Sequence, residues 1–219
     1  MKKVSIILPT YCPNEQVEGY LKDFIDSLNR TVKKDTYQFV VIEQGKQHFY
    51  PVDFTNSDNI YIHKDTPCGY ARAVNMGLAL ADGEYLVITN NDLVLPPKWL
   101  ETMLEDYEGG ILSPLDDKWQ NPEPKIYENA HWFSLVLMDR KTFSKVGYLD
   151  ESLPYRFHDQ DYSIRVKKAG FPVRRTGKVI VKHINMATYD AMGRPNEKSE
   201  EEEMLKRYNA LTFDQWIKK

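Results

Sequence analysis

Cysteine and net positive charge are both scarce in this chain. Its 219 residues include only two cysteines, Cys12 and Cys68, which are far apart and have no spacing typical of a metal or redox site. We therefore expect two reduced thiols, as is usual in a cytosolic protein. The formal net charge of -3 argues against a nucleic-acid partner, because nucleic-acid binding normally requires a basic face.

The sequence also lacks long apolar runs and the glycine-rich motif of dinucleotide-binding folds. No apolar run approaches the roughly 20 residues that a membrane-spanning helix needs. No basic, apolar leader follows Met1, so we expect a cytoplasmic protein without a transmembrane segment, with attachment at the periphery of a membrane left open. No Gly-x-Gly-x-x-Gly follows any expected strand, which excludes a dinucleotide-dependent oxidoreductase.

What the sequence does contain is an alternation of apolar strands and amphipathic helices. Residues 4–8 form a short apolar run ended by Pro9, which is typical of a central parallel strand covered on both faces. Further strands are expected at residues 37–42, 59–62 and 84–89, and a helix at residues 70–81. This order predicts an α/β fold with a parallel sheet in the first half.

The second half predicts a less regular set of elements. Residues 116–128 are rich in proline and polar residues and are expected to form a loop, whereas residues 132–138 are expected to form a strand. A helix is expected at residues 159–169, followed by two short strands at residues 171–173 and 179–181. The tail from residue 197 to 219 predicts a pair of charged amphipathic helices.

The most informative segment runs from Gly69 to Pro97. It contains Asn75-Met76-Gly77, then Ala81-Asp82-Gly83, an apolar strand, and Asn90-Asn91-Asp92. A carboxylate at the carboxyl end of a buried strand lies where open α/β sheets bind ligands. There it can hold a divalent metal against a phosphate. The order and spacing of these motifs resemble glycosyltransferase family 2, whose Asp-x-Asp metal motif has Asn90 in place of its first aspartate here.

This resemblance implies a fold and an activity. The fold would be a single GT-A (Rossmann-like) domain, with a mixed, mainly parallel central sheet flanked by helices and a C-terminal helical tail. Residues 1–95 would bind the nucleotide sugar, residues 96–185 the acceptor, and residues 186–219 would form the C-terminal loop and helices. The activity would be inverting, metal-assisted transfer of a hexosyl or rhamnosyl group from a UDP- or dTDP-linked donor to a hydroxyl of a glycan or other acceptor.

The resemblance also implies roles for individual residues of the first half. Asp92 matches the direct metal ligand, and His183 matches a histidine that reaches the metal or the diphosphate; the cation would be Mn²⁺ or Mg²⁺. The residues implied in nucleotide binding are Pro9, Thr10, Tyr11, Glu43, Asn75, Asn90 and Asn91. Four of these residues have simpler alternatives: a turn residue for Asp92, a strand end facing water for Glu43, plain packing for Tyr11 and hydrogen-bonded packing for His183.

A second cluster, from Phe157 to Arg165, resembles the family's Glu-Asp-x-Asp motif. Asp159 matches the general base, although as an alternative it could cap a helix. The acceptor-side residues would be Asp161, Trp132 and His158, of which His158 replaces the family glutamate. Asp161 is expected to pair with Arg165, four residues later on the same helix face. Trp132 could stack on a sugar ring or simply pack in the core.

Two other functions compete with transfer. Asn90 and His158 leave open a catalytically degenerate module that binds nucleotides or carbohydrates on the same fold. A sugar-1-phosphate nucleotidyltransferase would need a glycine-rich, basic phosphate loop after the first strand, and Pro9-Thr10-Tyr11-Cys12-Pro13 is not such a loop.

Overall fold

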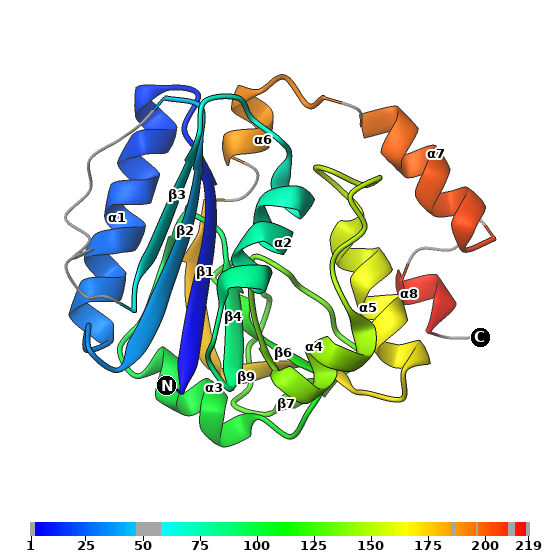
Figure 1. The fold of residues 1–219 in the computed structure, drawn as a ribbon. Helices are drawn as coiled ribbons and strands as arrows, with labels where there is room; N and C mark the ends of the chain where they lie inside the picture. Colours follow the sequence, from blue (N-terminus) through cyan, green and yellow to red (C-terminus); the bar gives the residue numbers. More distant parts are fainter. Residues whose placement is uncertain (1–2, 47–57, 185–186, 196, 210–212, 218–219) are drawn as a thin grey trace.

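A central sheet with helices on both faces organises the chain (Figure 1). The computed structural model describes residues 3–46, 58–184, 187–195, 197–209 and 213–217. The strands are β1 (Val4–Tyr11), β2 (Tyr37–Gln44), β3 (Ile60–Lys64), β4 (Tyr85–Thr89), β5 (Leu93–Val94), β6 (Ile111–Asp116), β7 (Ile126–Glu128), β8 (Leu135–Asp139) and β9 (Val173–His183). The helices are α1 (Glu15–Thr31), α2 (Tyr70–Leu80), α3 (Trp99–Asp106), α4 (Arg140–Val146), α5 (His158–Lys168), α6 (Ala187–Ala191), α7 (Glu197–Arg207) and α8 (Phe213–Trp216).

The strands lie in the order β3-β2-β1-β4-β8-β6-β9-β5, and β7 pairs with β9. All neighbours from β3 to β4 are parallel, whereas β8 runs antiparallel to both β4 and β6. The strand-helix alternation of the first half therefore predicted its sheet correctly. The expected mixed sheet flanked by helices is confirmed for the whole chain.

Each face of the sheet is covered by a helix that packs on β1. On one face, Phe24 of α1 belongs to the same buried apolar cluster as Ile6 and Leu8. On the other face, α2 approaches so closely that a Cβ at Gly77 would lie 2.3 Å from Ile7 Cγ2, so only glycine fits there. Figure 1 shows α1 and α2 on opposite sides of β1.

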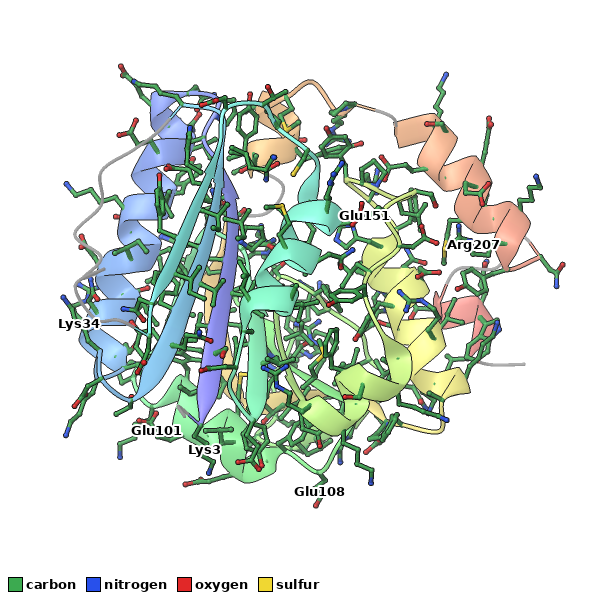
Figure 2. The ribbon with its side chains drawn as sticks, viewed as in Figure 1. Lys3, Lys34, Glu101, Glu108, Glu151 and Arg207 are labelled. Atoms are coloured by element: carbon green, nitrogen blue, oxygen red, sulfur yellow. The ribbon has the colours of Figure 1, made fainter. Side chains whose placement is uncertain are left out.

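Charged side chains gather on the outside of these layers. Lys34, Glu101 and Glu108 are exposed, and Figure 2 shows them at the rim of the molecule. Among the described residues, no helix combines the length and the apolar character needed to cross a bilayer.

Three sequence-based expectations in the second half need correction. The strand expected from residue 132 begins only at Leu135, because its ladder with β4 ends at the pair Thr89–Leu135. The two strands expected at residues 171–173 and 179–181 are one strand, β9 (Val173–His183), and residues 171–172 precede it. The expected loop at residues 116–128 contains β7, which pairs antiparallel with Arg174–Thr176 of β9. Each correction depends on pairing with a strand distant in sequence.

The C-terminal helix pair is confirmed as α7 and α8, and a short helix, α6, precedes it. In Figure 1 these elements run from the upper edge of the sheet to the outer side of α5. Residues 186, 196, 210–212 and 218–219 of the predicted C-terminal segment lie outside the described residues.

Candidate active site

A cavity of about 330 Å³ lies at the carboxyl edge of β1 and β4. Parallel strands bring their carboxyl ends to one edge, so residues 9–11 and 90–92 meet there. The antiparallel neighbour β8 begins at the same edge, where the Asn90 N–H donates to the Ser134 carbonyl at 2.7 Å. The predicted site residues that line the cavity are Pro9, Thr10, Tyr11, Asn90, Asn91, Asp92, Trp132, His158, Asp159 and His183. Asp92 and Asp159 therefore share one cavity.

Asp92 is buried and lies beside His183. It follows β4 directly, and the pairing of Leu93 with His183 brings β9 alongside. Asp92 Oδ1 is 3.3 Å from His183 Nε2, and both side chains are only 5% exposed. The family resemblance assigned both residues to the metal region, and the structure places them side by side although they are far apart along the chain.

The chemistry of this corner suits a divalent cation. Among the described residues, Asn90 Oδ1, Asp92 Oδ1 and His183 Nε2 are buried without a hydrogen-bond partner. Buried polar atoms nearly always have hydrogen-bond partners. Within the described part of the chain, Asp92 Oδ1 and His183 Nε2 face each other at 3.3 Å without forming a hydrogen bond, and Asn90 Oδ1 has no hydrogen-bond partner. Two oxygens and an imidazole nitrogen fit Mg²⁺ or Mn²⁺. Among the described residues, no group of three or more His, Cys, Asp and Glu side chains is placed to hold a metal ion, so this corner supplies only part of a coordination shell.

The side chain of Asn91 connects the elements that form the cavity. Its Nδ2 donates to Thr10 Oγ1 at 3.0 Å, and its Oδ1 accepts from Thr188 Oγ1 at 3.5 Å. These bonds connect the ends of β1 and β4 to α6. Asn91 lines the cavity, but its amide is already engaged on both sides.

Glu43 and Asn75, both expected at the nucleotide, are not among the described residues that line the cavity. Glu43 is 1% exposed and accepts a hydrogen bond from the Tyr61 hydroxyl. Asn75 Nδ2 donates to the Leu149 carbonyl, and Asn75 Oδ1 accepts from the Leu149 N–H, each at 2.9 Å. Both side chains thus connect parts of the fold, and the alternative of Glu43 as a strand end facing water is wrong.

Asp159 lies in the first turn of α5 and faces the cavity. Its side chain is 33% exposed, and its Oδ2 is 3.8 Å from His131 Nε2. The alternative role as a helix cap is wrong, because the N-cap position belongs to Phe157, which has a left-handed backbone at φ 58° and makes no side-chain cap bond. The carboxylate of Asp159 is therefore available to the cavity.

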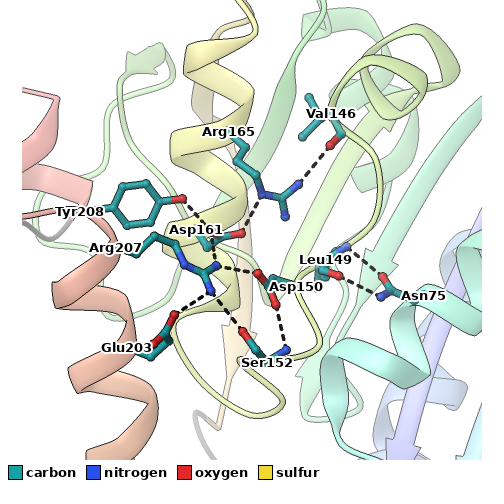
Figure 3. A network of polar contacts seen from close by, with 10 residues as sticks. All are labelled: Asn75, Val146, Leu149, Asp150, Ser152, Asp161, Arg165, Glu203, Arg207 and Tyr208. Carbon is teal, nitrogen blue, oxygen red and sulfur yellow. Dashed lines mark hydrogen bonds and ion pairs between the residues drawn. The ribbon is translucent and has the colours of Figure 1, made fainter.

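Asp161 is held inside the protein (Figure 3). It is 1% exposed and accepts from Arg165 Nε at 2.7 Å, Arg207 Nη1 at 3.1 Å and the Tyr208 hydroxyl at 2.6 Å. The predicted pair with Arg165 is confirmed. Asp161 is not among the described lining residues, so its bonds anchor α5 to α7 and leave no oxygen facing the acceptor side.

A second contact from α7 holds the loop that precedes α5. Glu200 Oε2 accepts from the backbone N–H groups of Tyr155, at 3.0 Å, and Arg156, at 2.7 Å. Tyr155 and Arg156 line the cavity. The C-terminal helix α7 thus shapes one wall of the cavity, which sequence periodicity alone did not reveal.

Trp132 packs against its neighbours at the border of the cavity. It lines the cavity, with its ring edge-on to His183 at 5.3 Å between centroids. Behind it, the Arg175 guanidinium lies 5.0 Å from the Trp132 ring and 4.7 Å from the Trp119 ring. Trp132 is therefore fixed by packing while one part of it borders the cavity.

Tyr70 is the most informative lining residue that the sequence did not single out. Its ring stacks on His158, with centroids 4.7 Å apart and planes at 26°. Burial raises the pKa of Tyr70 above its ordinary value, and the charges of Asp159 and then Asp92 raise it further. Burial lowers the pKa of His158, so its imidazole is neutral at neutral pH. The only available signal was an aromatic residue directly after Gly69 in the first motif.

Comparison with known sequences gives one family. Residues 5–113 match the family described as glycosyl transferase family 2. The chain is also 24% identical, over 155 residues, to the glucosyl-dolichyl phosphate glucuronosyltransferase of Haloferax volcanii. That alignment covers 65% of this chain and 47% of the relative, so the chain spans about half of the relative's length.

Solved structures share the fold. GalNAc-T7, determined with UDP, GalNAc and Mn²⁺, superposes with a TM-score of 0.68 at 13% identity, over 83% of this chain and 43% of that one. S. aureus TarS 1-349 in complex with UDP gives a TM-score of 0.61 at 14% identity, over 96% of this chain and 72% of that one. The fold is thus the GT-A fold that the motifs predicted.

Proposed function

Because this chain belongs to glycosyl transferase family 2 through residues 5–113, we propose that it transfers a sugar from a nucleoside-diphosphate donor to an acceptor hydroxyl. The single observation that carries this proposal is that Asp92 and Asp159 line one cavity. Inverting transfer needs a group that stabilises the departing diphosphate and a base on the opposite side of the sugar. Asp159 would supply the base, and Asp92 would help to bind the cation that stabilises the diphosphate.

On the donor side, the nucleotide lies along Pro9, Thr10 and Tyr11, with its diphosphate toward Asn90 and Asp92. A divalent cation bound by Asp92 and His183 would supply Lewis-acid stabilisation of the charge on the leaving diphosphate. The buried, unpartnered oxygens of Asn90 and Asp92 support this placement. The base is uracil or thymine, and the transferred group is hexosyl or rhamnosyl.

On the acceptor side, Asp159 acts as the general base. It accepts the proton of the acceptor hydroxyl while that oxygen forms its bond to the anomeric carbon and the bond to the diphosphate oxygen breaks. Attack from the face opposite the diphosphate inverts the anomeric centre. A positioned base of this kind contributes about 10²–10⁴-fold in rate.

The variant Asp159→Asn tests this assignment. We expect transfer to fall by at least about 100-fold, while the Kd for UDP stays within about twofold of the wild-type value, because the amide keeps the shape but not the basicity. Transfer is measured with a panel of nucleotide sugars, and UDP binding by calorimetry. Asp82→Asn is the matched control, since Asp82 is exposed and is not among the lining residues. Wild-type activity in Asp159→Asn would refute the assignment.

A binding module without activity is the second candidate, and it is favoured by the two departures Asn90 and His158. Such a module would bind UDP equally with and without Mn²⁺ and would release no free sugar from UDP-sugars. Metal-dependent turnover of any nucleotide sugar would exclude it.

One class of acceptor, the lipid-linked saccharides, can be tested directly. The Haloferax volcanii relative is named for a glucosyl-dolichyl phosphate substrate, so a lipid-linked saccharide is one acceptor to include beside free glycans. Action on such an acceptor would require the chain to work at the surface of a membrane. Sedimentation with vesicles that contain a lipid-linked saccharide measures this association.

A further inference from the structure

Two residues that line the cavity, Tyr70 and His158, each have a buried polar atom without a hydrogen-bond partner in the described part of the chain. The Tyr70 hydroxyl and His158 Nδ1 have no hydrogen-bond partner among the described residues, although both atoms are buried and both residues line the cavity. A buried donor or acceptor without a partner costs free energy. A ligand group that fills both positions recovers this cost on binding.

The pair is held rigidly by its two helices. Tyr70 opens α2 directly after Gly69, which has φ 88° and lies against Pro154, and the Ala71 N–H donates to the Pro154 carbonyl at 3.1 Å. His158 opens α5, with its ring edge-on to Phe133 at 6.2 Å between centroids. The stacked rings therefore form a fixed wall and not a mobile surface.

The place of this wall in the cavity indicates which part of a substrate it meets. His158 is the immediate neighbour of Asp159, the proposed base. Tyr70 lines the same cavity as Asp92 and Asp159. In an inverting displacement the transferred sugar lies between the base and the diphosphate, which is the same region.

The charge state of the pair indicates what it can bind. Tyr70 and His158 are both neutral at neutral pH, so they suit an uncharged group that can donate and accept. The family pattern has a glutamate where this chain has His158, and a carboxylate could only accept hydrogen bonds. A sugar hydroxyl can accept from the Tyr70 O–H and donate to His158 Nδ1 at the same time.

We propose that Tyr70 and His158 together bind a hydroxyl of the transferred sugar and thereby determine which nucleotide sugar the cavity accepts. This inference rests on the proposed function, because it takes the ligand to be a nucleotide sugar. It adds a sugar-specificity site to that function.

The test compares UDP with UDP-glucose and UDP-galactose, and dTDP with dTDP-rhamnose, in the presence of Mn²⁺. Tyr70→Phe removes one oxygen and keeps the stacked ring. For the best-bound nucleotide sugar we expect its Kd to rise by about 5–20-fold, while the Kd of the matching free nucleotide changes by less than about twofold. Tyr148→Phe is the matched control, because Tyr148 is 49% exposed and is not among the lining residues.

A second experiment identifies the contact itself. For a series of deoxy analogues of that nucleotide sugar, one analogue should bind wild type and Tyr70→Phe equally, because it lacks the hydroxyl that Tyr70 contacts. His158→Phe keeps an aromatic ring but removes the hydrogen-bond acceptor. It should weaken binding of the same nucleotide sugar without changing binding of the free nucleotide.

Two results would overturn the inference. Equal binding of the nucleotide sugar by Tyr70→Phe and wild type would exclude the contact and leave the proposed function intact. An equal loss of free nucleotide and nucleotide sugar would show that Tyr70 acts on the nucleotide or on folding. A wild-type chain that binds no nucleotide or nucleotide sugar at all would overturn the proposed function as well.

Discussion

One corner of the cavity contains Asn90, Asp92 and His183. There the backbone is hydrogen-bonded, but within the described part of the chain side-chain atoms of these residues are not. Ile184 donates its N–H to the Asp92 carbonyl at 3.1 Å, so the backbone at Asp92 is fixed on both sides. The unbonded atoms are those with the chemistry to bind a cation. We therefore expect the motif Asn90-Asn91-Asp92 to make UDP binding depend on a divalent cation.

Asp92→Asn should remove that dependence. Replacing the carboxylate by an amide removes the only charged oxygen of the corner, so we expect Mn²⁺ to tighten UDP binding by at least about tenfold in wild type and by less than about twofold in the variant. Calorimetry with MnCl₂ or EDTA measures both values. Asp23→Asn, on the exposed side of α1, is the control. Unchanged metal dependence in Asp92→Asn would contradict the assigned ligand.

The sequence predicted well which residues lie at the cavity where a local motif marks them. It predicted this poorly where a partner distant in sequence determines the position of the side chain. Asp92 and Asp159 each follow a recognisable pattern, and both line the cavity. Asn75 also lies in a recognisable pattern, but its amide is bonded to Leu149, 74 residues away. No feature of the sequence near Asn75 records that partner.

At the scale of elements, α5 carries the proposed base and is held from outside by α7. Arg207 donates to Asp150 Oδ2 at 2.6 Å and to Asp161 Oδ1 at 3.1 Å (Figure 3). Its partner Asp161 is fully buried, so the loss of a donor there leaves charge poorly compensated. This contact fixes the rotation of α5 and, with it, the direction of Asp159.

Arg207→Ala should therefore weaken the fold more than a surface ion pair would. We expect the free energy of unfolding to fall by about 1–3 kcal/mol, since Arg165 and Tyr208 still bind Asp161. Arg194→Ala breaks an exposed pair with Asp190 and should cost less than about 0.5 kcal/mol. Urea denaturation of both variants measures the difference, and equal losses would count against the anchoring role of Arg207.

Elements with strong internal periodicity were predicted closely, and elements defined by pairing were not. The helix α2 and the strands β1, β2 and β4 lie within a few residues of their expected positions. In contrast, β7 exists because residues 126–128 pair with β9, and β8 starts late because β4 ends. Both depend on the sheet order and not on local composition.

At the scale of the whole molecule, the cavity is assembled from segments spread along the chain. The sheet order places the β1 and β4 ends beside the start of β8, and β9 returns to add His183. The order of short motifs predicted this arrangement because those motifs terminate neighbouring strands. The position of α7 was not predictable, because its amphipathic pattern fits any apolar surface.

The pH dependence of stability should report on the docking of α7. Burial raises the pKa of Glu200 above its ordinary value of 4.5, although the two backbone N–H bonds oppose this shift. The folded state then holds the proton more tightly than the unfolded state, so this group lowers stability as pH rises through the folded pKa. Glu200→Gln removes the ionisation. We expect its Tm, relative to wild type, to increase between pH about 4.5 and about 7.

Thermal unfolding across this pH range measures the difference, with Glu202→Gln, exposed on the same helix, as the control. A Tm difference for Glu200→Gln that does not change with pH would show that Glu200 does not ionise in this way.

The position of Trp132 allows its fluorescence to report on the cavity. Of the four tryptophans in the chain, only Trp132 is among the described residues that border the cavity, and it contacts the His183 ring. Its emission is therefore sensitive to any molecule or ion that changes the polarity or charge beside it. Occupancy of the cavity can be followed by intrinsic fluorescence, without a label and without turnover.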